Sequence, residues 1–329
     1  MKGLQKIGIL TSGGDAPGMN AAIRAVTRTA INNGLQVEGI IAGYKGLLFK
    51  EFIALNSQSV SGIIQTGGTI LRTARCPEFM DYSCRKTAIE NLQSEGIDAL
   101  VVLGGDGTFR GAAAISKEFD FPIIGIPCTI DNDICGTDYT IGSDTCLNTV
   151  VNAVDNIRDT ASSHNRIFFV EVMGHESGSV AMHSGLACGA EIILIPEQHN
   201  QIERARQFLA ERAMQNKSSV IMVAEGVHGG ATQIAEQLSA EFPQFEMRVS
   251  VLGYIQRGGR PSAYDRTTAS QFGVAAVHSL LNGKTNMMVG LMNGKIHLEP
   301  FQTAVKMHKK ASETFVMVAE SIGTFTPMD

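Results

Sequence analysis

The chain has 329 residues, of which 44% are hydrophobic and 18% charged, and its formal net charge is −5. This hydrophobic content supports a large folded core and excludes a disordered chain. The mildly negative charge excludes the basic field that non-specific nucleic-acid binding needs, so we expect no nucleic-acid partner. The length predicts two domains or one large one.

Short apolar segments alternate with longer amphipathic segments. In chain order, the predicted elements are a strand at Ile7–Leu10, a helix at Met19–Asn32, a strand at Val37–Ala42, a helix at Cys84–Glu95, strands at Ile97–Leu103 and Pro122–Ile126, a helix at Leu147–Thr160, strands at Ile167–Val172 and Ile192–Ile195, a helix at Ile202–Gln215, a strand at Val220–Ala224 and a helix at Thr232–Phe242. The strands lack alternating polarity, which is typical of parallel sheets covered on both faces. The sequence therefore predicts an α/β fold with doubly wound, mainly parallel sheets and helices on both faces.

Localisation is predicted from the lack of targeting signals. The first ten residues contain no long apolar stretch typical of a signal peptide, and the apolar segments elsewhere are too short to span a bilayer. The six cysteines include no Cys-x-x-Cys pair, so a zinc or redox motif has no support. We expect a cytoplasmic protein without a membrane partner.

Two loops that follow predicted strands are suited to phosphate. The loop Thr11–Gly18 is rich in glycine and precedes a helix, whose N-terminal N–H groups favour anions. The loop Gly104–Thr108 follows a buried strand and reads Gly-Gly-Asp-Gly-Thr. In it Asp106 is the expected magnesium contact, because Mg²⁺ prefers oxygen ligands. Thr108 is the expected donor to a phosphate oxygen.

A third loop, Pro127–Asp133, carries a pair of carboxylates after another predicted strand. Asp131 and Asp133 are two residues apart, so they would share a face if the backbone is extended. Two carboxylates at one site either hold a metal or act as a base, whereas a solvated acidic turn is the alternative. The loops Glu171–Gly178 and Val251–Pro261 are weaker signals, although the second carries an arginine flanked by glycines, typical of an anion contact.

Together, Thr11–Gly18, Gly104–Thr108, Thr129–Asp133 and Gly253–Gly259 resemble the bacterial type of ATP-dependent 6-phosphofructokinase. The resemblance runs from about Lys6 to about Gly290. It implies transfer of the γ-phosphoryl group of MgATP to the 1-hydroxyl of fructose 6-phosphate, the committed step of glycolysis, with ATP as co-substrate. It also implies an allosteric homotetramer whose active sites are shared across subunit interfaces.

The resemblance assigns roles by position. The implied ATP site comprises Gly14, Tyr44, Arg75, Cys76, Gly105, Asp106, Gly107 and Thr108, and the implied Mg²⁺ contacts are Asp106 and Asp133. The implied sugar-phosphate site comprises Thr129, Ile130, Asp131, Arg166, Met173, Gly174, His175, Glu225, Arg248, Tyr254 and Arg257. The implied catalytic residues are Asp131 as general base, Thr129 and His175, and Arg166 and Arg248 would reach the site from a neighbouring subunit. The implied allosteric residues are Arg24, Arg28, Arg158 and Glu191.

Several positions depart from the family pattern. His175 and Tyr254 stand where the family usually has Arg and His, and a histidine side chain is largely uncharged near pH 7.5. Ser57 and Gly62 alter the expected regulatory surface, so the sequence does not identify the effector. These changes leave one alternative function, a catalytically weakened paralogue that senses nucleotide or sugar phosphate or serves as a subunit.

A pyrophosphate-dependent enzyme is the other alternative. Pyrophosphate-dependent relatives carry Asp and Lys where this chain has Gly107 and Cys128. The glycine leaves space for the nucleoside part of ATP, and pyrophosphate would lose the charge partner that the lysine provides. The sequence therefore favours ATP as the phosphoryl donor.

Two domains are predicted. The nucleotide-binding domain is expected to span residues 1–141 plus 256–305. The sugar-phosphate-binding domain is expected to span residues 142–255 plus 306–329.

Overall fold

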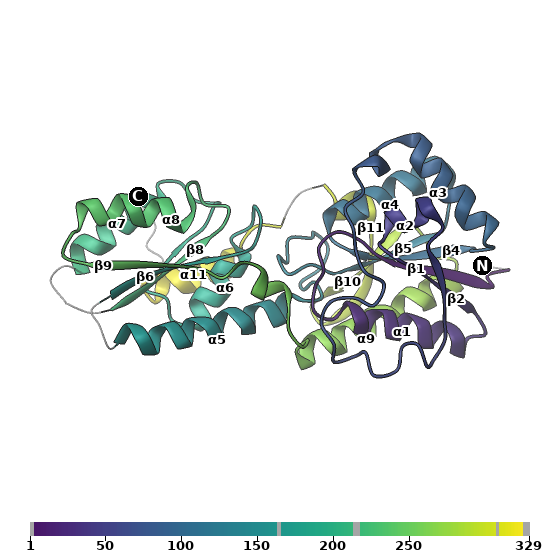
Figure 1. Ribbon diagram of the computed structural model, residues 1–329, viewed down its shortest axis with the longest axis horizontal. Coiled ribbons are helices and arrows are strands. Elements are labelled where there is room, and N and C mark those ends of the chain that lie inside the picture. The colour runs from purple at the N-terminus through teal and green to yellow at the C-terminus, as the bar shows by residue number, and fades with distance from the viewer. Residues whose placement is uncertain (1–2, 163–165, 213–217, 307–308, 325–329) are drawn as a thin grey trace. The chain divides into compact units, whose positions relative to one another are not determined.

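The computed structural model describes residues 3–162, 166–212, 218–306 and 309–324 (Figure 1). The chain divides into two compact units. Unit 1 comprises Met1–Ile130, Ile134–Thr145 and Arg257–Met307, and unit 2 comprises Asp131–Asp133, Cys146–Gln256 and His308–Asp329. The predicted α/β class with mainly parallel sheets is confirmed.

Unit 1 is built on a sheet with the strand order β11-β10-β5-β4-β1-β2-β3. Its strands are β1 (Lys6–Thr11), β2 (Gln36–Ile40), β3 (Phe52–Leu55), β4 (Ala99–Gly104), β5 (Ile123–Pro127), β10 (Met287–Met292) and β11 (Lys295–Pro300). The strands from β10 to β2 pair in parallel, whereas β3 and β11 pair antiparallel at the two edges. β4 and β5 are buried along their whole length, as their continuous apolar sequences predict.

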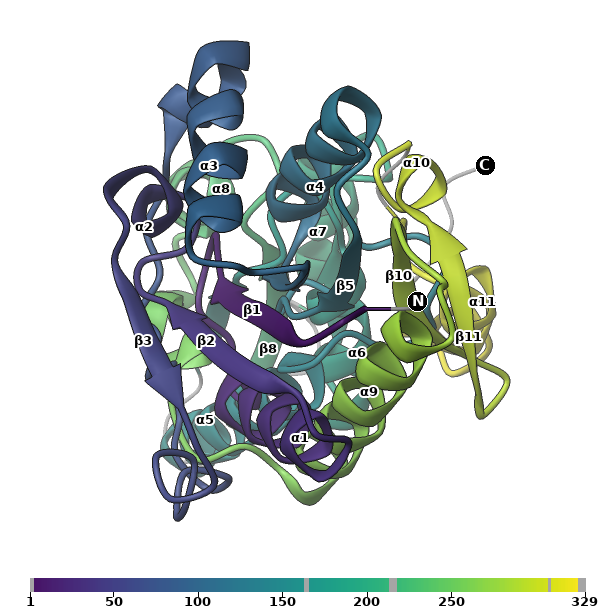
Figure 2. The ribbon, with the colours of Figure 1, turned by 90° about the vertical axis from the view of Figure 1, so that its right-hand side faces the viewer.

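Helices cover both faces of this sheet. The described helices of unit 1 are α1 (Met19–Asn32), α2 (Tyr44–Phe49), the 3₁₀ helix η1 (Pro77–Met80), α3 (Tyr82–Ser94), α4 (Asp106–Phe119), α9 (Ala263–Leu281) and α10 (Phe301–Ala304). Figure 2 shows α1 and α9 on one face and α3 and α4 on the other. The buried rings of Phe109 and Phe301 pack against each other on the α4 side, with centroids 5.7 Å apart.

Unit 2 contains a parallel sheet with the strand order β7-β8-β6-β9. Its strands are β6 (Arg166–Val172), β7 (Ile192–Leu194), β8 (Ser219–Ala224) and β9 (Glu246–Val251). Its described helices are α5 (Ser143–Ser162, which begins in unit 1), α6 (Ser179–Ala187), α7 (Gln201–Arg212), α8 (Gly230–Glu241), the 3₁₀ helix η2 (Gly253–Arg257) and α11 (Glu313–Ser321). Figure 1 shows α7 and α8 on one face of this sheet and α5 and α6 on the other.

The structure adds elements to the prediction, and the borders between its two units differ from the predicted domain borders by one to four residues, apart from one reassigned segment. The elements that the sequence does not predict are the strands β3, β9, β10 and β11 and the helices α2, α4, α6, α9, α10 and α11. The predicted end of the helix Ile202–Gln215 lies outside the described residues. Residues Asp131–Asp133, predicted to lie in the nucleotide-binding domain, belong to unit 2. One reason is that the carbonyl of Asp133 accepts a hydrogen bond from the N–H of Lys309, 2.8 Å away.

Among the described helices, none has both the length and the apolar content that crossing a bilayer requires.

Candidate active site

Three predicted loops meet beyond the carboxyl ends of β1, β4 and β5, through residues that belong to unit 1. The N–H of Ser12 donates to the carbonyl of Leu103 at 3.0 Å, and Thr108 Oγ1 donates to the carbonyl of Ser12 at 3.1 Å. The N–H of Cys128 donates to the carbonyl of Gly104 at 2.9 Å. Such a convergence at the carboxyl edge is where open α/β sheets bind ligands.

Glycines allow these loops to lie close together and leave open space beside the second loop. A Cβ atom on Gly104 would lie 2.5 Å from the Ser12 carbonyl oxygen, so no other residue fits there without movement. A Cβ atom on Gly105 would lie 3.6 Å from Thr129 Cβ, which places the second loop beside the third. A Cβ atom on Gly107 would meet nothing within 4 Å, so the backbone there faces open space.

Arg257 lies against the first of these loops. Its Nη1 atom is 3.4 Å from the Asp15 carbonyl oxygen, and its guanidinium occupies the space that a side chain at Gly14 would need. Thr73 Oγ1 donates to the Gly13 carbonyl at 2.6 Å from another side. The loop is therefore held in place with a cation beside it, and the predicted sugar-phosphate contact Arg257 lies in the same unit as the ATP loops.

Tyr44 lies beneath the ATP loops rather than on their surface. Its ring is buried and stacks on Phe79 with centroids 4.1 Å apart, and its Oη donates to the Thr108 carbonyl at 2.6 Å. Burial raises the pKa of Tyr44 well above its ordinary value, so the hydroxyl stays protonated. The side chain supports the loop, and direct contact with ATP stays a prediction.

Two other predicted ATP-site residues differ in exposure: Arg75 is exposed, and Cys76 is half-buried.

Asp106 is the first residue of α4, and its Oδ2 forms an ion pair with Arg110 Nε at 2.8 Å. Within the described residues, no group of three His, Cys, Asp or Glu side chains is arranged to hold a metal ion. Mg²⁺ in kinases keeps several waters and binds through one or two carboxylates plus substrate phosphates. The donor set here, a partly accessible Asp106 beside the phosphate loops, fits that ion.

The predicted carboxylate pair is buried but not on an extended backbone. Asp131 and Asp133 expose 9% and 7% of their surface. Asn132 between them has φ +49°, in the left-handed region, so the extended chain assumed from the sequence is wrong. Ile130 is fully buried, and the Thr129 carbonyl accepts from Thr140 Oγ1 at 2.7 Å. Because of the turn at Asn132, the directions of the two carboxylates cannot be predicted from their spacing along an extended chain.

In unit 2 the loop after β6 is tied to the loop after β8. Glu225 Oε1 accepts from the N–H groups of Gly174 at 3.1 Å and His175 at 2.7 Å. Gln256 Oε1 accepts from the N–H of Met173 at 3.2 Å. The structure thus brings together four predicted sugar-phosphate residues. Gln256 is a further residue of this site that the sequence does not predict, although it lies within the motif Val251–Pro261.

His175 is exposed and adopts a left-handed backbone, with φ +55°. This conformation is uncommon for a residue other than glycine and is typical of ligand-binding loops. The side chain is therefore presented to solvent by a backbone that Glu225 holds.

The predicted residues Arg166 and Arg248 lie away from this loop. Arg166 begins β6, while Met173 follows the end of the same strand. Six strand steps separate Arg166 from Val172 at the end of β6, which corresponds to about 20 Å, and Met173 is one residue further on. Arg166 Nε pairs with Glu246 Oε2 at 2.8 Å, and Arg248 pairs with the same carboxylate. Within one unit 2, these arginines and the Met173–His175 loop do not form a single site.

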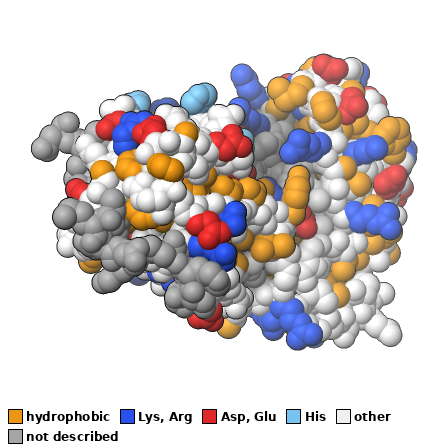
Figure 3. Space-filling view, turned by 60° about the vertical axis from the view of Figure 1, so that its left-hand side comes forward, with side chains coloured by type: hydrophobic (Ala, Val, Ile, Leu, Met, Phe, Trp, Pro, Cys, Tyr) orange, Lys and Arg blue, Asp and Glu red, His pale blue; other side chains and the backbone are white. Residues whose placement is uncertain are grey.

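The described surface of unit 2 carries exposed hydrophobic side chains. Figure 3 shows several separate groups of hydrophobic atoms on the face of this unit that is turned forward. Residues of this kind on the edge strand β9 and the following η2 are Val249, Val251, Tyr254 and Ile255, which are 37–85% exposed. Large exposed apolar groups near one sheet edge are typical of a protein interface.

The predicted allosteric residues are split between the units. In unit 2, Arg158 Nη1 pairs with Glu191 Oε1 at 3.2 Å. In unit 1, Arg24 and Arg28 lie one turn apart on α1, and no described carboxylate pairs with either. Two such cations on one helix face suit an anionic ligand.

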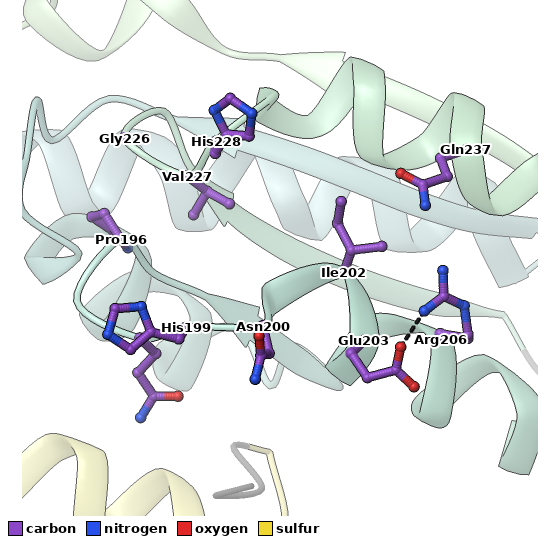
Figure 4. Close-up of a pocket in the computed structure, with 11 residues that line it drawn as sticks. Pro196, His199, Asn200, Ile202, Glu203, Arg206, Gly226, Val227, His228 and Gln237 are labelled. Atoms are coloured by element: carbon purple, nitrogen blue, oxygen red, sulfur yellow. Dashed lines mark hydrogen bonds and ion pairs between the residues drawn. The ribbon is translucent and has the colours of Figure 1, made fainter.

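A cavity of about 570 Å³ lies elsewhere in unit 2 (Figure 4). Its walls come from the segments after β7 and β8 and from α7 and α8, and they include His199, His228 and the ion pair between Glu203 and Arg206. None of the predicted site residues lines it.

Comparisons with known proteins identify close relatives. Residues 6–280 match the family model described as phosphofructokinase. The chain is 52% identical over 318 residues to ATP-dependent 6-phosphofructokinase 2 of Bacteroides thetaiotaomicron, covering 96% of this chain and 98% of the relative. It is 48% identical over 319 residues to ATP-dependent 6-phosphofructokinase 1 of Thermus thermophilus, covering 96% and 99%.

Solved structures give the same picture at lower identity. The T-state phosphofructokinase of Pichia pastoris superposes with a TM-score of 0.87 at 37% identity, over 98% of this chain and 37% of that one. A pyrophosphate-dependent phosphofructokinase of Marinobacter aquaeolei superposes with a TM-score of 0.84 at 22% identity, over 99% and 94%. The second likeness shows the fold alone.

Proposed function

The chain belongs to the phosphofructokinase family, and on this premise we propose that it transfers the γ-phosphoryl group of ATP to the 1-hydroxyl of fructose 6-phosphate. The products are fructose 1,6-bisphosphate and ADP. The observation that carries the proposal is the 52% identity to an ATP-dependent enzyme across nearly the whole of both chains. The meeting of three glycine-rich or acidic loops beyond β1, β4 and β5 supports it.

ATP rather than pyrophosphate is the proposed donor. The open space over Gly107 leaves room for the nucleoside part of ATP. Cys128 is almost fully buried, and burial raises the pKa of its thiol well above the ordinary value, so the group stays neutral. It therefore supplies no positive charge for a short donor such as pyrophosphate.

Catalysis is proposed to depend on positioning and charge more than on covalent chemistry. Asp131 accepts the proton of the acceptor hydroxyl as the new bond to phosphorus forms. Glu225 fixes the backbone that presents His175. Arg257 is the cation beside the first phosphate loop, where it offsets negative charge on a bound phosphate.

Mg²⁺ would be held by Asp106, with Asp133 as the second predicted contact. When bound with ATP, the ion neutralises charge on the phosphate oxygens and orients the donor. Arg110 pairs with Asp106 in the structure, so metal binding competes with this ion pair.

We further propose that the enzyme is an allosteric homotetramer of the cytoplasm. About 20 Å of strand separates Arg166 from the Met173 loop, so both can serve one sugar phosphate only if one of them comes from a second subunit. The exposed hydrophobic side chains near β9 support such an interface. Arg24, Arg28, Arg158 and Glu191 are the proposed effector contacts.

A coupled assay with fructose 6-phosphate and either ATP or pyrophosphate tests the donor and the activity together. We expect turnover with MgATP and at most a small fraction of that rate with pyrophosphate. A preference for pyrophosphate would overturn the choice of donor. Binding of both ATP and fructose 6-phosphate without turnover by either donor would instead identify a sensor protein.

A further inference from the structure

A short C-terminal segment of unit 2, Lys309–Ala311, is hydrogen bonded to three separate loops. The N–H of Lys309 donates to the Asp133 carbonyl at 2.8 Å, and its carbonyl accepts from Ser177 Oγ at 3.2 Å. The N–H of Ala311 donates to Glu197 Oε1 at 3.0 Å. The segment therefore joins the carboxylate loop, the loop after β6 and the loop after β7.

Glu197 links this segment to the loop after β6 a second time. Both of its carboxylate oxygens lie within hydrogen-bond distance of the Gly178 N–H, at 2.9 and 3.1 Å. A Cβ atom at Gly178 would lie 2.6 Å from Glu197 Oε2, so the glycine allows this close approach. Charge-assisted bonds of this kind are among the stronger hydrogen bonds in proteins.

The helix that follows anchors the segment to the core of unit 2. Phe315 in α11 packs on the ring of His183 in α6, with centroids 4.1 Å apart, and Ala319 is fully buried. Helix α6 begins at Ser179, directly after the loop that carries Met173 and His175. Packing of α11 therefore fixes Lys309–Ala311 relative to the start of α6.

We propose that Lys309–Ala311 is a strap that positions the Asp131–Asp133 loop against the Met173–Gly178 loop. This inference rests on the proposed function, since it assigns to the strap the task of placing the general base relative to the acceptor sugar phosphate. Glu197 acts as a positioning residue, because it contacts the strap and the loop and not the reacting atoms. A misplacement of about 1 Å in such a site costs up to about a hundredfold in rate.

The test removes single hydrogen bonds of the strap. Ala311→Pro deletes the N–H that Glu197 accepts, and Glu197→Ala deletes the acceptor. We expect each to lower kcat/KM for fructose 6-phosphate about tenfold while KM for ATP stays within about twofold. Glu197→Gln should restore most of the loss, because its amide oxygen accepts the same N–H groups.

Matched controls separate positioning from general damage. Ala311→Gly keeps the N–H, and Met317→Ala changes an exposed residue of α11. Both should retain parental kinetics. The double variant Glu197→Ala/Ala311→Pro should be no worse than Glu197→Ala alone, because both changes delete the same bond.

Hydrogen exchange gives a readout that does not need turnover. In folded Ala311→Pro protein, amides of residues 129–135 should exchange faster than in the parent chain. Unchanged exchange there would overturn the strap, as would parental kinetics for fructose 6-phosphate in Ala311→Pro. An inactive parent chain would contradict the proposed function instead, and the exchange measurement would still decide on the strap.

Discussion

Asp131 combines two features expected of a general base in phosphoryl transfer. It follows a buried strand of the sheet that carries the ATP loops, and only 9% of its surface is exposed. Asp131→Asn keeps the size and polarity of the side chain but removes its capacity to accept a proton. We expect kcat to fall by about two to four decades with little change in either KM. Steady-state kinetics of the folded variant test this, and a kcat near the parental value would remove Asp131 from the role.

His175 is one of the positions at which the chain departs from the expected family pattern. Its left-handed backbone and exposed side chain leave room for a longer cation at the same Cβ position. A fixed donor aimed at the transferring group is worth about 2.7–4 kcal/mol, and an imidazole supplies only part of that. His175→Arg should therefore raise kcat about tenfold at pH 7.5.

The control for this variant is His199→Arg, which places the same cation at an exposed position of unit 2. We expect it to leave kcat unchanged. If His175→Arg also has no effect, His175 does not act on the phosphoryl group.

At the scale of elements, the contact between α6 and α11 predicts a pH-dependent stability. Burial lowers the pKa of His183, and the positive charge of Lys309 adds to the shift. As pH falls below about 6.5, the unfolded chain takes up a proton before the folded chain does, so the free energy of unfolding falls. Urea unfolding at pH 7.5 and at pH 5 measures this loss.

His183→Gln should reduce the difference between the two pH values, since it removes the titrating ring. His278→Gln, at an exposed position on α9, should leave the difference as it is in the parent. An equal loss of stability in the parent and in His183→Gln would show that other groups cause the acid sensitivity.

The sequence predicts most of the buried parallel strands, although it misses β10, and it predicts edge strands poorly. Runs such as Ala99–Leu103 are continuously apolar because both faces of the strand are covered. The missed strand β9 lies at a sheet edge and alternates polar and apolar residues, so it lacks the continuous apolar sequence by which the buried strands are predicted. Helix α4 begins inside the motif Gly104–Thr108, and the low helix propensity of its glycines obscures the start of the helix in the sequence.

For the site as a whole, the sequence motifs predict the identity of the candidate site residues better than they predict the positions of these residues in the fold. Loops that follow parallel strands converge at one edge by geometry, and this is how Ser12, Gly104 and Cys128 meet. The turn at Asn132 and the pairing of Lys309 with Asp133 depend on contacts between distant segments, which residue spacing does not encode. In contrast, the distance between Arg166 and the loop at Met173 can be calculated from the length of β6, because both lie at opposite ends of this one strand.

The proposed sharing of sites between subunits can be tested by complementation. Asp131→Asn and Arg248→Ala proteins should each be nearly inactive alone. In a hybrid, each interface between the two variants contains one intact site, which combines Asp131 of one chain with Arg248 of the other. Random mixing should therefore restore about a quarter of parental activity. Verified hybrids that stay inactive would show that each site is built from one chain.

Transfer of a phosphoryl group from ATP to the 1-hydroxyl of fructose 6-phosphate is the activity from which the other predictions follow. ³¹P NMR of the chain with MgATP and fructose 6-phosphate follows every phosphorus atom in one sample. We expect the signals of ADP and of a new sugar 1-phosphate to grow in equal amounts, while the 6-phosphate remains esterified. Release of inorganic phosphate without the new ester, or unchanged spectra with an intact and folded protein, would contradict this activity.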